Sequence, residues 1–421
     1  MKIKTIPLLV FLILFSWTNA QKNGKQINRE SDVPSYQLPK LLESDRGSIK
    51  NKAQWEKYRR PIILEQFASQ VYGKVPGQLP IDRIEVLEMD TEALGGKAIR
   101  KQLMLHFKKG DRSMGFPVLL YIPKRKQKVP VFMGYNFLGN HSIAEDPFIL
   151  IDGKKEDEME KEDLSNFKPE SRGSRVSRWP VEDIINAGYA LLTVNYNTVD
   201  PDKDDFSNGI HPLFYQENQT APEPDEWGAL AAWAWSMSRV LDYLETEPLI
   251  SADKAILFGH SRLGKAALWA GANDPRFSIV ISNNSGCGGA AISRRRFGEK
   301  VVDINTKFPH WFAKNFHQYN DNESELPVDQ HMLVALMAPR PVYIASASKD
   351  DWADPMGEFL SAKFATSVYQ LYGFKEFNFD SFPKVNSPIH KRIGYHLREG
   401  KHNITHYDWD QFIKFANQHL K

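Results

Sequence analysis

The pattern of apolar and polar positions along the chain changes near residue 129. Before that point, short strand-like segments separated by turn residues predict an antiparallel start at 83–89, 99–107 and 116–123. After it, apolar runs typical of buried parallel strands alternate with helix-like stretches. The later strands are expected at 129–135, 187–197, 255–261, 277–286 and 340–351, and the helices at 55–73, 226–245, 356–372 and 408–420. This alternation predicts an α/β fold with a mostly parallel sheet and helices on both faces.

An antiparallel lead into such a sheet is typical of the α/β-hydrolase fold, a three-layer sandwich. We expect residues 51–421 to form a single domain of this kind after a polar lead at 21–50. The segment 137–180 contains the charged run KKEDEMEKED and is expected to be a long surface insertion. In open α/β sheets ligands bind at the carboxyl ends of the strands, so residues that follow strands are the first candidates for chemistry.

The first twenty residues have the features of a secretory signal peptide. Lys2 and Lys4 precede the apolar run IPLLVFLILFSW at 6–17, and TNA follows it. This run is shorter than the roughly 20 residues needed to span a bilayer, so a cleaved signal is expected rather than a membrane anchor. The protein is therefore expected in the periplasm or outside the cell.

Charge and cysteine content exclude several classes of protein. The 421-residue chain has 54 Lys+Arg and 52 Asp+Glu, and removing residues 1–20 with their two lysines leaves 52 of each. A formally neutral chain gives no support to nucleic-acid binding. Cys287 is the single cysteine, which excludes an intramolecular disulfide, and no cysteine follows the signal for a lipid anchor. A monomer is the default expectation.

A serine lies between a predicted strand and a predicted helix in FGHSRLGKAALWAG, residues 258–271. Ser261 is either the cap of this helix or a nucleophile on a strand-to-helix turn. The common hydrolase turn reads G-x-S-x-G, whereas here the second glycine is displaced by one residue, to Gly264. A serine hydroxyl needs a base, and the base needs an orienting acid, in the chain order serine, acid, histidine for this fold.

Asp350 is the first carboxylate after the strand in ASASKDDWADP, where this fold presents its acid. Asp351 and Asp354 are the alternatives, and Asp354 before a proline is typical of a helix start. Among twelve histidines, His402 lies on a glycine-containing loop before the last helix, and His406 is its neighbour and competitor. Position along the chain favours Asp350 as the acid and His402 as the base.

Further polar residues surround the serine in sequence or follow other strands. The backbone N–H of Arg262 lies where an oxyanion donor is required, and its guanidinium is able to add charge-assisted hydrogen bonds. Lys265 is one helical turn beyond Ser261 and either lines the pocket or is a surface charge. Glu299 and Trp352 are weak candidates individually. The turn NFLGNH at 136–141 occupies the place of an oxyanion loop without the tandem glycines of lipases.

Several motifs together resemble carbohydrate esterase family 15, the glucuronoyl esterases. GHSRLGK is similar to the family's G-C-S-R-x-G-K turn, with His260 in place of cysteine, which accounts for the displaced glycine. NFLGNH, SGCGGAAISRRRFGE, DQHMLVALMAPRPV, DDWADP and GKHNITHYDW resemble its other blocks in order, over roughly residues 50–421. The resemblance implies Ser261 as nucleophile, His402 as base, Arg262 as oxyanion donor, and Lys265, Glu299 and Trp352 as contacts to the glucuronate ring.

One position departs from the family pattern. Many bacterial members carry a catalytic glutamate in a block like S-N-E-S-G-C-G-G, whereas this chain has Asn284 in SNNSGCGG. An amide has no charge with which to hold an imidazolium, so the role of acid is expected to fall to Asp350.

The reaction implied by the resemblance is hydrolysis of the ester between (4-O-methyl-)glucuronic acid of glucuronoxylan and a lignin alcohol. It proceeds through a covalent glucuronoyl-serine intermediate and requires no metal or other cofactor. Two alternatives remain open: another serine carbohydrate esterase, such as an acetyl-xylan esterase, and a catalytically inactive carbohydrate-binding relative.

Overall fold

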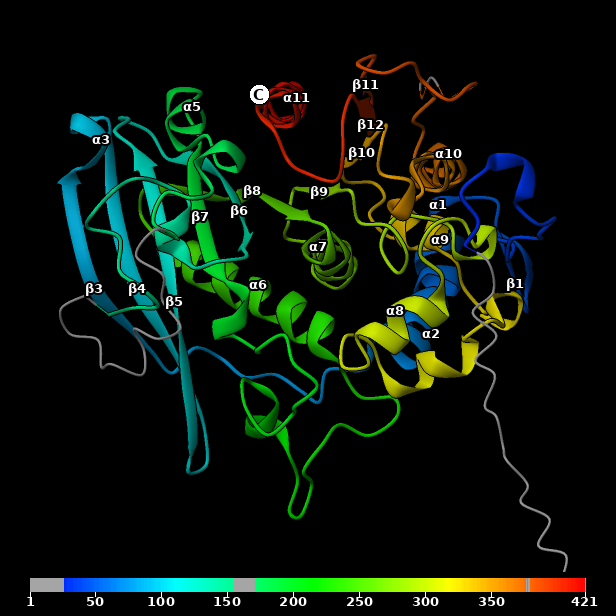
Figure 1. Cartoon of the computed structure of the whole chain (residues 1–421), viewed down its shortest axis with the longest axis horizontal. Helices are drawn as coiled ribbons and strands as arrows, with labels where there is room; N and C mark the ends of the chain where they lie inside the picture. Colours follow the sequence, from blue (N-terminus) through cyan, green and yellow to red (C-terminus); the bar gives the residue numbers. More distant parts are fainter. Residues whose placement is uncertain (1–25, 155–170, 376, 378, 421) are drawn as a thin grey trace, which may run out of the picture.

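A ten-stranded sheet forms the centre of the molecule in the computed structural model, which describes residues 26–154, 171–375, 377 and 379–420 (Figure 1). Its strand order is β11-β12-β10-β9-β8-β6-β7-β5-β4-β3. The strands are β3 (Arg83–Glu92), β4 (Ala98–Lys109), β5 (Arg112–Pro123), β6 (Val129–Asn136), β7 (Ala190–Asn195), β8 (Ile250–His260), β9 (Ile279–Asn283), β10 (Val342–Ala347), β11 (Ile389–His390) and β12 (Ile393–Arg398). Strands β7, β6, β8, β9, β10 and β12 are neighbours in this order and pair in parallel. Strands β3, β4 and β5 at one side of the sheet and β11 at the other pair antiparallel with their neighbours. The predicted α/β-hydrolase fold, including its antiparallel start, is confirmed.

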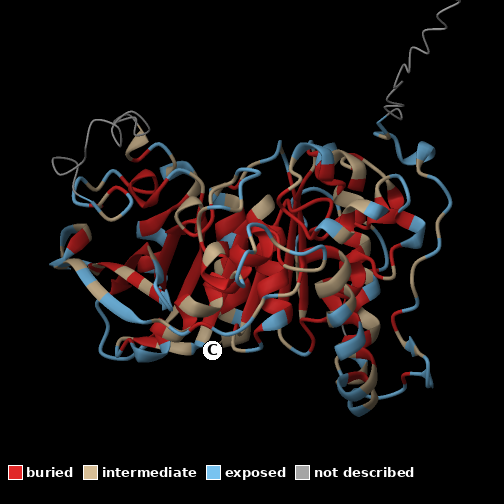
Figure 2. Ribbon diagram, turned by 90° about the horizontal axis from the view of Figure 1, so that it is seen from below, coloured by how far each residue is buried: buried red, intermediate tan, exposed pale blue. Residues whose placement is uncertain are grey.

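Helices cover both faces of this sheet. The described helices are α1 (Lys52–Gln54), α2 (Arg60–Phe67), α3 (Ala93–Gly96), α5 (Val181–Asn186), α6 (Ala229–Thr246), α7 (Arg262–Asn273), α8 (Val301–Lys307), α9 (Gln330–Ala335), α10 (Pro355–Leu371) and α11 (His406–Leu420). α5 and α11 lie on one face, where they share an apolar cluster with β7 and β8. α6, α7, α9 and α10 pack against the opposite face. Buried residues accordingly follow the sheet and the inner faces of the helices (Figure 2).

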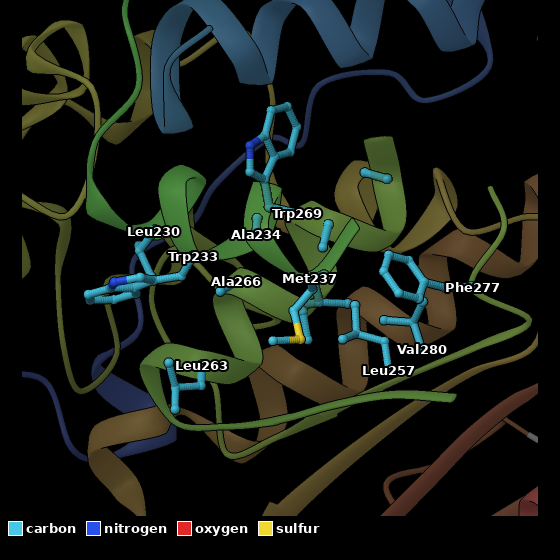
Figure 3. Packing of buried hydrophobic residues seen from close by; sticks show 14 of the residues in the cluster. Leu230, Trp233, Ala234, Met237, Leu257, Leu263, Ala266, Trp269, Phe277 and Val280 are labelled. Atoms are coloured by element: carbon cyan, nitrogen blue, oxygen red, sulfur yellow. The ribbon is translucent and has the colours of Figure 1, made fainter. Parts of the chain in front are cut away.

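Helices α6 and α7 pack against each other over the sheet through buried apolar side chains (Figure 3). Trp233 and Met237 of α6 and Ala266 and Trp269 of α7 are all at most 2% exposed. Burying one large apolar side chain stabilises a fold by about 1.5–3 kcal/mol. This packing fixes the direction in which α7 leaves the sheet, and α7 begins directly after Ser261.

The elements that the sequence missed are short or contain charges. α5, α8 and α9 have only six or seven residues, too few to display a helical period. β11 and β12 lie in IHKRIGYHLR, which reads as polar. His396 and Arg398 are nevertheless buried in β12 because both contact a buried aspartate of α11.

The segment 137–180 differs from the predicted surface insertion in its first part. Asn140 and His141 are at most 5% exposed, and Asp146 accepts hydrogen bonds from Tyr121 of β5 (2.7 Å) and Arg100 of β4 (2.5 Å). Polar side chains of the sheet thus hold this part of the chain against β4 and β5. Residues 155–170, with most of the charged run, lie outside the described residues, as does the predicted signal peptide. No helix in the described part of the chain has the length and hydropathy of a membrane span.

Asp408, the third residue of α11, joins this helix to the carboxyl end of the sheet. Its fully buried carboxylate accepts hydrogen bonds from Nε2 of His396 (2.9 Å) and from the backbone N–H of Thr405 (2.7 Å). It also pairs with Nε of Arg398 at 2.9 Å. These contacts fix both ends of the loop 399–405, which connects β12 to α11.

We expect Asp408→Asn to lower the free energy of unfolding by about 3–5 kcal/mol, because it leaves the buried Arg398 guanidinium without its counter-charge. Urea denaturation followed by circular dichroism measures this change. Asp410→Asn is the matched control, since Asp410 is exposed on the same helix and its replacement is expected to change stability by less than about 0.5 kcal/mol. Equal stability of the two variants would contradict the role given to Asp408.

His260 ends β8 with its side chain buried. It is 4% exposed, and its Nδ1 lies 2.6 Å from Oδ1 of Asn283, to which it donates. Burial, followed by the positive charges of His402 and Arg178, lowers the pKa of His260 well below its ordinary value. The ring is therefore neutral in the folded protein at pH values where the unfolded chain binds a proton at this residue.

This difference predicts that folding loses stability as the pH falls below about 6.5, the ordinary pKa of histidine, whereas the contribution is fully present above it. A single histidine ring changes the free energy of unfolding by at most about 1.4 kcal/mol per pH unit. Urea denaturation at pH 7.5, 6.0 and 5.0 is expected to give a flatter dependence for His260→Cys than for the wild type. Parallel curves for the two proteins would show that His260 does not carry this effect.

Candidate active site

Ser261 occupies a strained turn between β8 and α7. Its φ of 59° and ψ of −130° lie in a region that residues other than glycine rarely adopt. The turn is held by a hydrogen bond from the Ser261 N–H to the carbonyl of Asn283 (2.9 Å). The hydroxyl makes no capping bond to the described backbone of α7, which leaves it available for other contacts. Of the two readings left open by the sequence, this geometry favours the nucleophile over the helix cap.

Two glycines permit this turn. A Cβ on Gly259 would lie 2.0 Å from the carbonyl oxygen of Leu263, so any other residue there would displace the first turn of α7. A Cβ on Gly264 would lie 3.0 Å from Cβ of Ser285. Gly264 therefore faces the loop 284–286, and the displaced second glycine serves close packing of α7 against that loop.

The predicted base and acid lie together. Nδ1 of His402 is 2.6 Å from Oδ2 of Asp350, which is 4% exposed. Because a carboxylate accepts, this contact places a proton on Nδ1 and leaves Nε2 of a neutral ring as the basic nitrogen. The rings of His402 and His260 are 4.8 Å apart, so the imidazole lies beside the serine turn.

The competing residues have other partners or surroundings. Asp354 accepts from Nε of Arg295 (2.8 Å) and caps α10. Asp351 is exposed. His406 lies 3.5 Å from Asp183, and both side chains are 64% exposed. The choice of Asp350 and His402 from their positions along the chain therefore agrees with the observed contacts.

Asn284 contacts the same carboxylate. Its Nδ2 donates to Oδ2 of Asp350 at 2.8 Å, so the position at which the family pattern has a glutamate still faces the histidine's partner. The following loop is held by Glu358, which accepts from the N–H groups of Ser285 (2.8 Å) and Gly286 (3.0 Å). Burial raises the pKa of Glu358 to about 8.

Arg262 forms an ion pair with Asp202, which lies in the loop after β7. The guanidinium carbon is 4.6 Å from the ring centre of Trp311 and 5.3 Å from that of Phe308. Sequence reasoning missed both Asp202 and Glu358. Asp202 lies in the acidic stretch DPDKDD, which by itself is typical of a solvated loop, and Glu358 lies within a predicted helix.

The three residues proposed to contact sugar also lie close together. Nζ of Lys265 is 3.8 Å from the Glu299 carboxylate and donates to the carbonyl of Ser285 at 2.5 Å. The N–H of Glu299 donates to the carbonyl of Trp352 at 3.0 Å. Burial raises the pKa of Glu299, whereas the Trp352 side chain is exposed, with 41% of its residue surface accessible. This group combines a buried cation, a buried carboxyl and an accessible aromatic ring.

No group of three or more His, Cys, Asp or Glu side chains suited to a metal ion occurs in the described part of the chain. The arrangement of Ser261, His402 and Asp350 suits acyl transfer by nucleophilic catalysis. A neutral imidazole oriented by a buried carboxylate is the base that a serine hydroxyl requires.

Comparison with known proteins identifies the family. The family model of glucuronyl esterases from fungi matches residues 177–373. A carbohydrate esterase from an unknown prokaryotic organism is 44% identical over 430 aligned residues, which cover 99% of this chain and 98% of that protein. A 4-O-methyl-glucuronoyl methylesterase of Wolfiporia cocos is 34% identical over 220 residues, about half of each chain (50% and 52%).

The fold agrees equally closely with a solved structure. The glucuronoyl esterase from Solibacter usitatus superposes with a TM-score of 0.86 at 44% identity, covering 93% of this chain and 100% of that one. The similarity therefore extends over nearly the whole chain. This chain belongs to carbohydrate esterase family 15, the glucuronoyl esterases, and is a carboxylic ester hydrolase.

Proposed function

We propose that this protein hydrolyses the ester between (4-O-methyl-)glucuronic acid of glucuronoxylan and lignin alcohols, using Ser261, His402 and Asp350 as a catalytic triad. The observation that carries the proposal is the 2.6 Å contact between His402 and Asp350 beside the strained turn at Ser261. The 4-O-methyl-glucuronoyl methylesterases among its relatives support the uronate ester as substrate.

The reaction begins with attack of Ser261 Oγ on the C6 carbonyl carbon of the uronate ester. Nε2 of His402 takes the hydroxyl proton, while Asp350 holds the ring in one tautomer and stabilises the imidazolium. His402 then protonates the departing alcohol, and a glucuronoyl-serine ester remains. Water, deprotonated by the same nitrogen, hydrolyses this ester and releases the uronate and free Ser261.

The tetrahedral intermediates carry negative charge on the former carbonyl oxygen. The N–H and guanidinium of Arg262 are the donors we assign to this oxyanion, and losing one such donor typically costs about 10²–10³ in rate. Lys265 and Glu299 are assigned to the sugar hydroxyls. Trp352 offers an exposed aromatic wall to the sugar ring.

Export is part of the proposal. The basic and apolar residues at 1–20 support a cleaved signal peptide, and a plant cell-wall substrate is a polymer that reaches the enzyme outside the cytoplasm. Residues 51–421 are proposed to act as a single domain and as a monomer, without a cofactor.

The substrate assignment predicts that the wild type cleaves benzyl glucuronate with a much higher kcat/KM than 4-nitrophenyl acetate, and that Ser261→Ala lowers kcat by about 10⁴ or more. Steady-state kinetics on both esters measures this. A preference for the acetyl ester would instead indicate an acetyl esterase. No turnover, together with no labelling of Ser261 by a fluorophosphonate, would indicate an inactive carbohydrate-binding protein.

The acid assignment predicts that Asp350→Asn lowers kcat by about 10³–10⁴, because an amide in this place favours the wrong imidazole tautomer. Adding Asn284→Glu to Asp350→Asn is expected to restore part of kcat, since residue 284 already contacts residue 350. Asp351→Asn serves as the control because Asp351 is exposed and adjacent. If Asp350→Asn retains wild-type kcat, another carboxylate orients His402.

A further inference from the structure

The carboxylate of Asp202 accepts four hydrogen bonds beside the serine turn. One carboxylate oxygen, Oδ1, accepts from Nε2 of His310 (2.8 Å) and Nε1 of Trp311 (2.6 Å). The other, Oδ2, accepts from the Tyr196 hydroxyl (2.9 Å) and from the Arg262 guanidinium. Tyr196 follows β7, whereas His310 and Trp311 lie after α8. These contacts hold one carboxylate in one orientation from three parts of the chain.

This carboxylate is ionised at any pH at which the protein would work. Its side chain is 10% exposed, and burial opposes ionisation. Hydrogen bonds from His310, Trp311 and Tyr196 and the charge of Arg262 outweigh burial and lower the pKa of Asp202 to about 2. Asp202 therefore supplies a permanent negative charge next to the guanidinium.

The guanidinium of Arg262 is confined as well as paired. Its carbon lies 4.6 Å, 5.3 Å and 5.9 Å from the ring centres of Trp311, Phe308 and Phe137. The rings of Trp311 and Phe308 stack at 3.7 Å, which limits the space around the cation. Nε of Arg262 is buried and has no hydrogen-bond partner among the described residues. One N–H group of the cation is thus committed to Asp202, and another remains without a partner.

Pairing changes what this cation binds. The C6 group of the ester is neutral before reaction, whereas the product is a carboxylate. An unpaired guanidinium binds a carboxylate strongly, often through two parallel hydrogen bonds. With Asp202 beside it, Arg262 remains a hydrogen-bond donor for a transient oxyanion, while its net attraction for a stable product anion is reduced.

We propose that Asp202 is a positioning and specificity-determining residue that fixes Arg262 against Trp311 and balances its charge, so that the free uronate product leaves the site. The proposal rests on the proposed function in so far as Arg262 serves the oxyanion of an ester hydrolysis. The positioning of Arg262 and the balance of its charge can be tested separately, because one substitution of Asp202 moves the carboxylate and another removes its charge.

Asp202→Asn removes the charge with little change in size, and Asp202→Glu keeps the charge but moves it. For Asp202→Asn we expect kcat on benzyl glucuronate to fall about 10–100-fold and the inhibition constant for free glucuronate to fall about tenfold or more. For Asp202→Glu we expect kcat to fall while the inhibition constant stays within about threefold of the wild type. Asp204→Asn, an exposed position in the same loop, is the matched control for both quantities.

A merely structural role would not move the inhibition constant, so unchanged glucuronate inhibition in Asp202→Asn would overturn the charge-balancing part. If this variant does not fold, Arg262→Gln decides the point, because it leaves Asp202 unpaired and is expected to weaken glucuronate inhibition. Unchanged inhibition of Arg262→Gln by free glucuronate would equally overturn the charge-balancing part.

A double-mutant cycle tests whether Asp202 acts through Arg262. Asp202→Asn is expected to cause no further loss of kcat when Arg262 is already Gln, and an equal loss in both backgrounds would overturn the positioning role. The cycle is measured on 4-nitrophenyl acetate as well as on benzyl glucuronate. If the wild type fails to cleave the uronate ester, the substrate assignment falls, whereas the acetyl ester still decides the role of Asp202.

Discussion

The left-handed turn at Ser261 is the constraint on which the rest of the site depends. One residue separates the end of β8 from the start of α7, so the helix must begin directly at the carboxyl end of this central strand. Gly259 and Gly264 allow this close approach, because side chains there would meet the backbone of α7 and the loop 284–286. The first turn of α7 then places Arg262 and Lys265 on the side of the serine. Strain in the turn is offset by the extensive packing of α7 against α6 and the sheet.

The loop 284–286 connects this turn to Asp350, the proposed acid. Asn284 donates to Asp350, Glu358 accepts from the backbone of the next two residues, and Lys265 donates to the carbonyl of Ser285. Helix α7, which follows Ser261, and the turn after β10 that carries Asp350 are therefore connected through one short segment. Because each contact uses a different backbone or side-chain atom, the segment is held in one conformation by several independent hydrogen bonds.

The sequence predicted the parts of this arrangement that depend on local order along the chain. Ser261, Asp350 and His402 were predicted because each follows a recognisable strand or precedes a recognisable helix, and the structure places Asp350 and His402 in contact. Asp202 and Glu358 were not predicted, because their partners Arg262 and Ser285 are 60 and 73 residues away. Neither has a local pattern that separates it from a solvated or helical carboxylate.

The same difference explains the errors in the fold. The core strands β6 to β10 were predicted because apolar runs mark burial directly. β12 was missed because its burial depends on the contacts of His396 and Arg398 with Asp408, which is ten or more residues away. The inner part of 137–180 was missed because Asp146 finds its partners on β4 and β5. A polar side chain is buried only where it has a hydrogen-bond or charge partner, and that partner is brought near by the tertiary structure rather than by the local sequence.

Asn284 illustrates how such a partner constrains the chemistry. Its φ of 48° lies in the left-handed region, which asparagine tolerates better than most residues. Its amide donates to the anionic oxygen that also faces His402, so it stabilises the charge of Asp350. A second carboxylate in this place would repel the first, and one of the two would have to bind a proton. With Asp350 as the proposed acid, a neutral donor at residue 284 is thus the electrostatically consistent choice, and Asn284 and the proposed position of the acid form one feature.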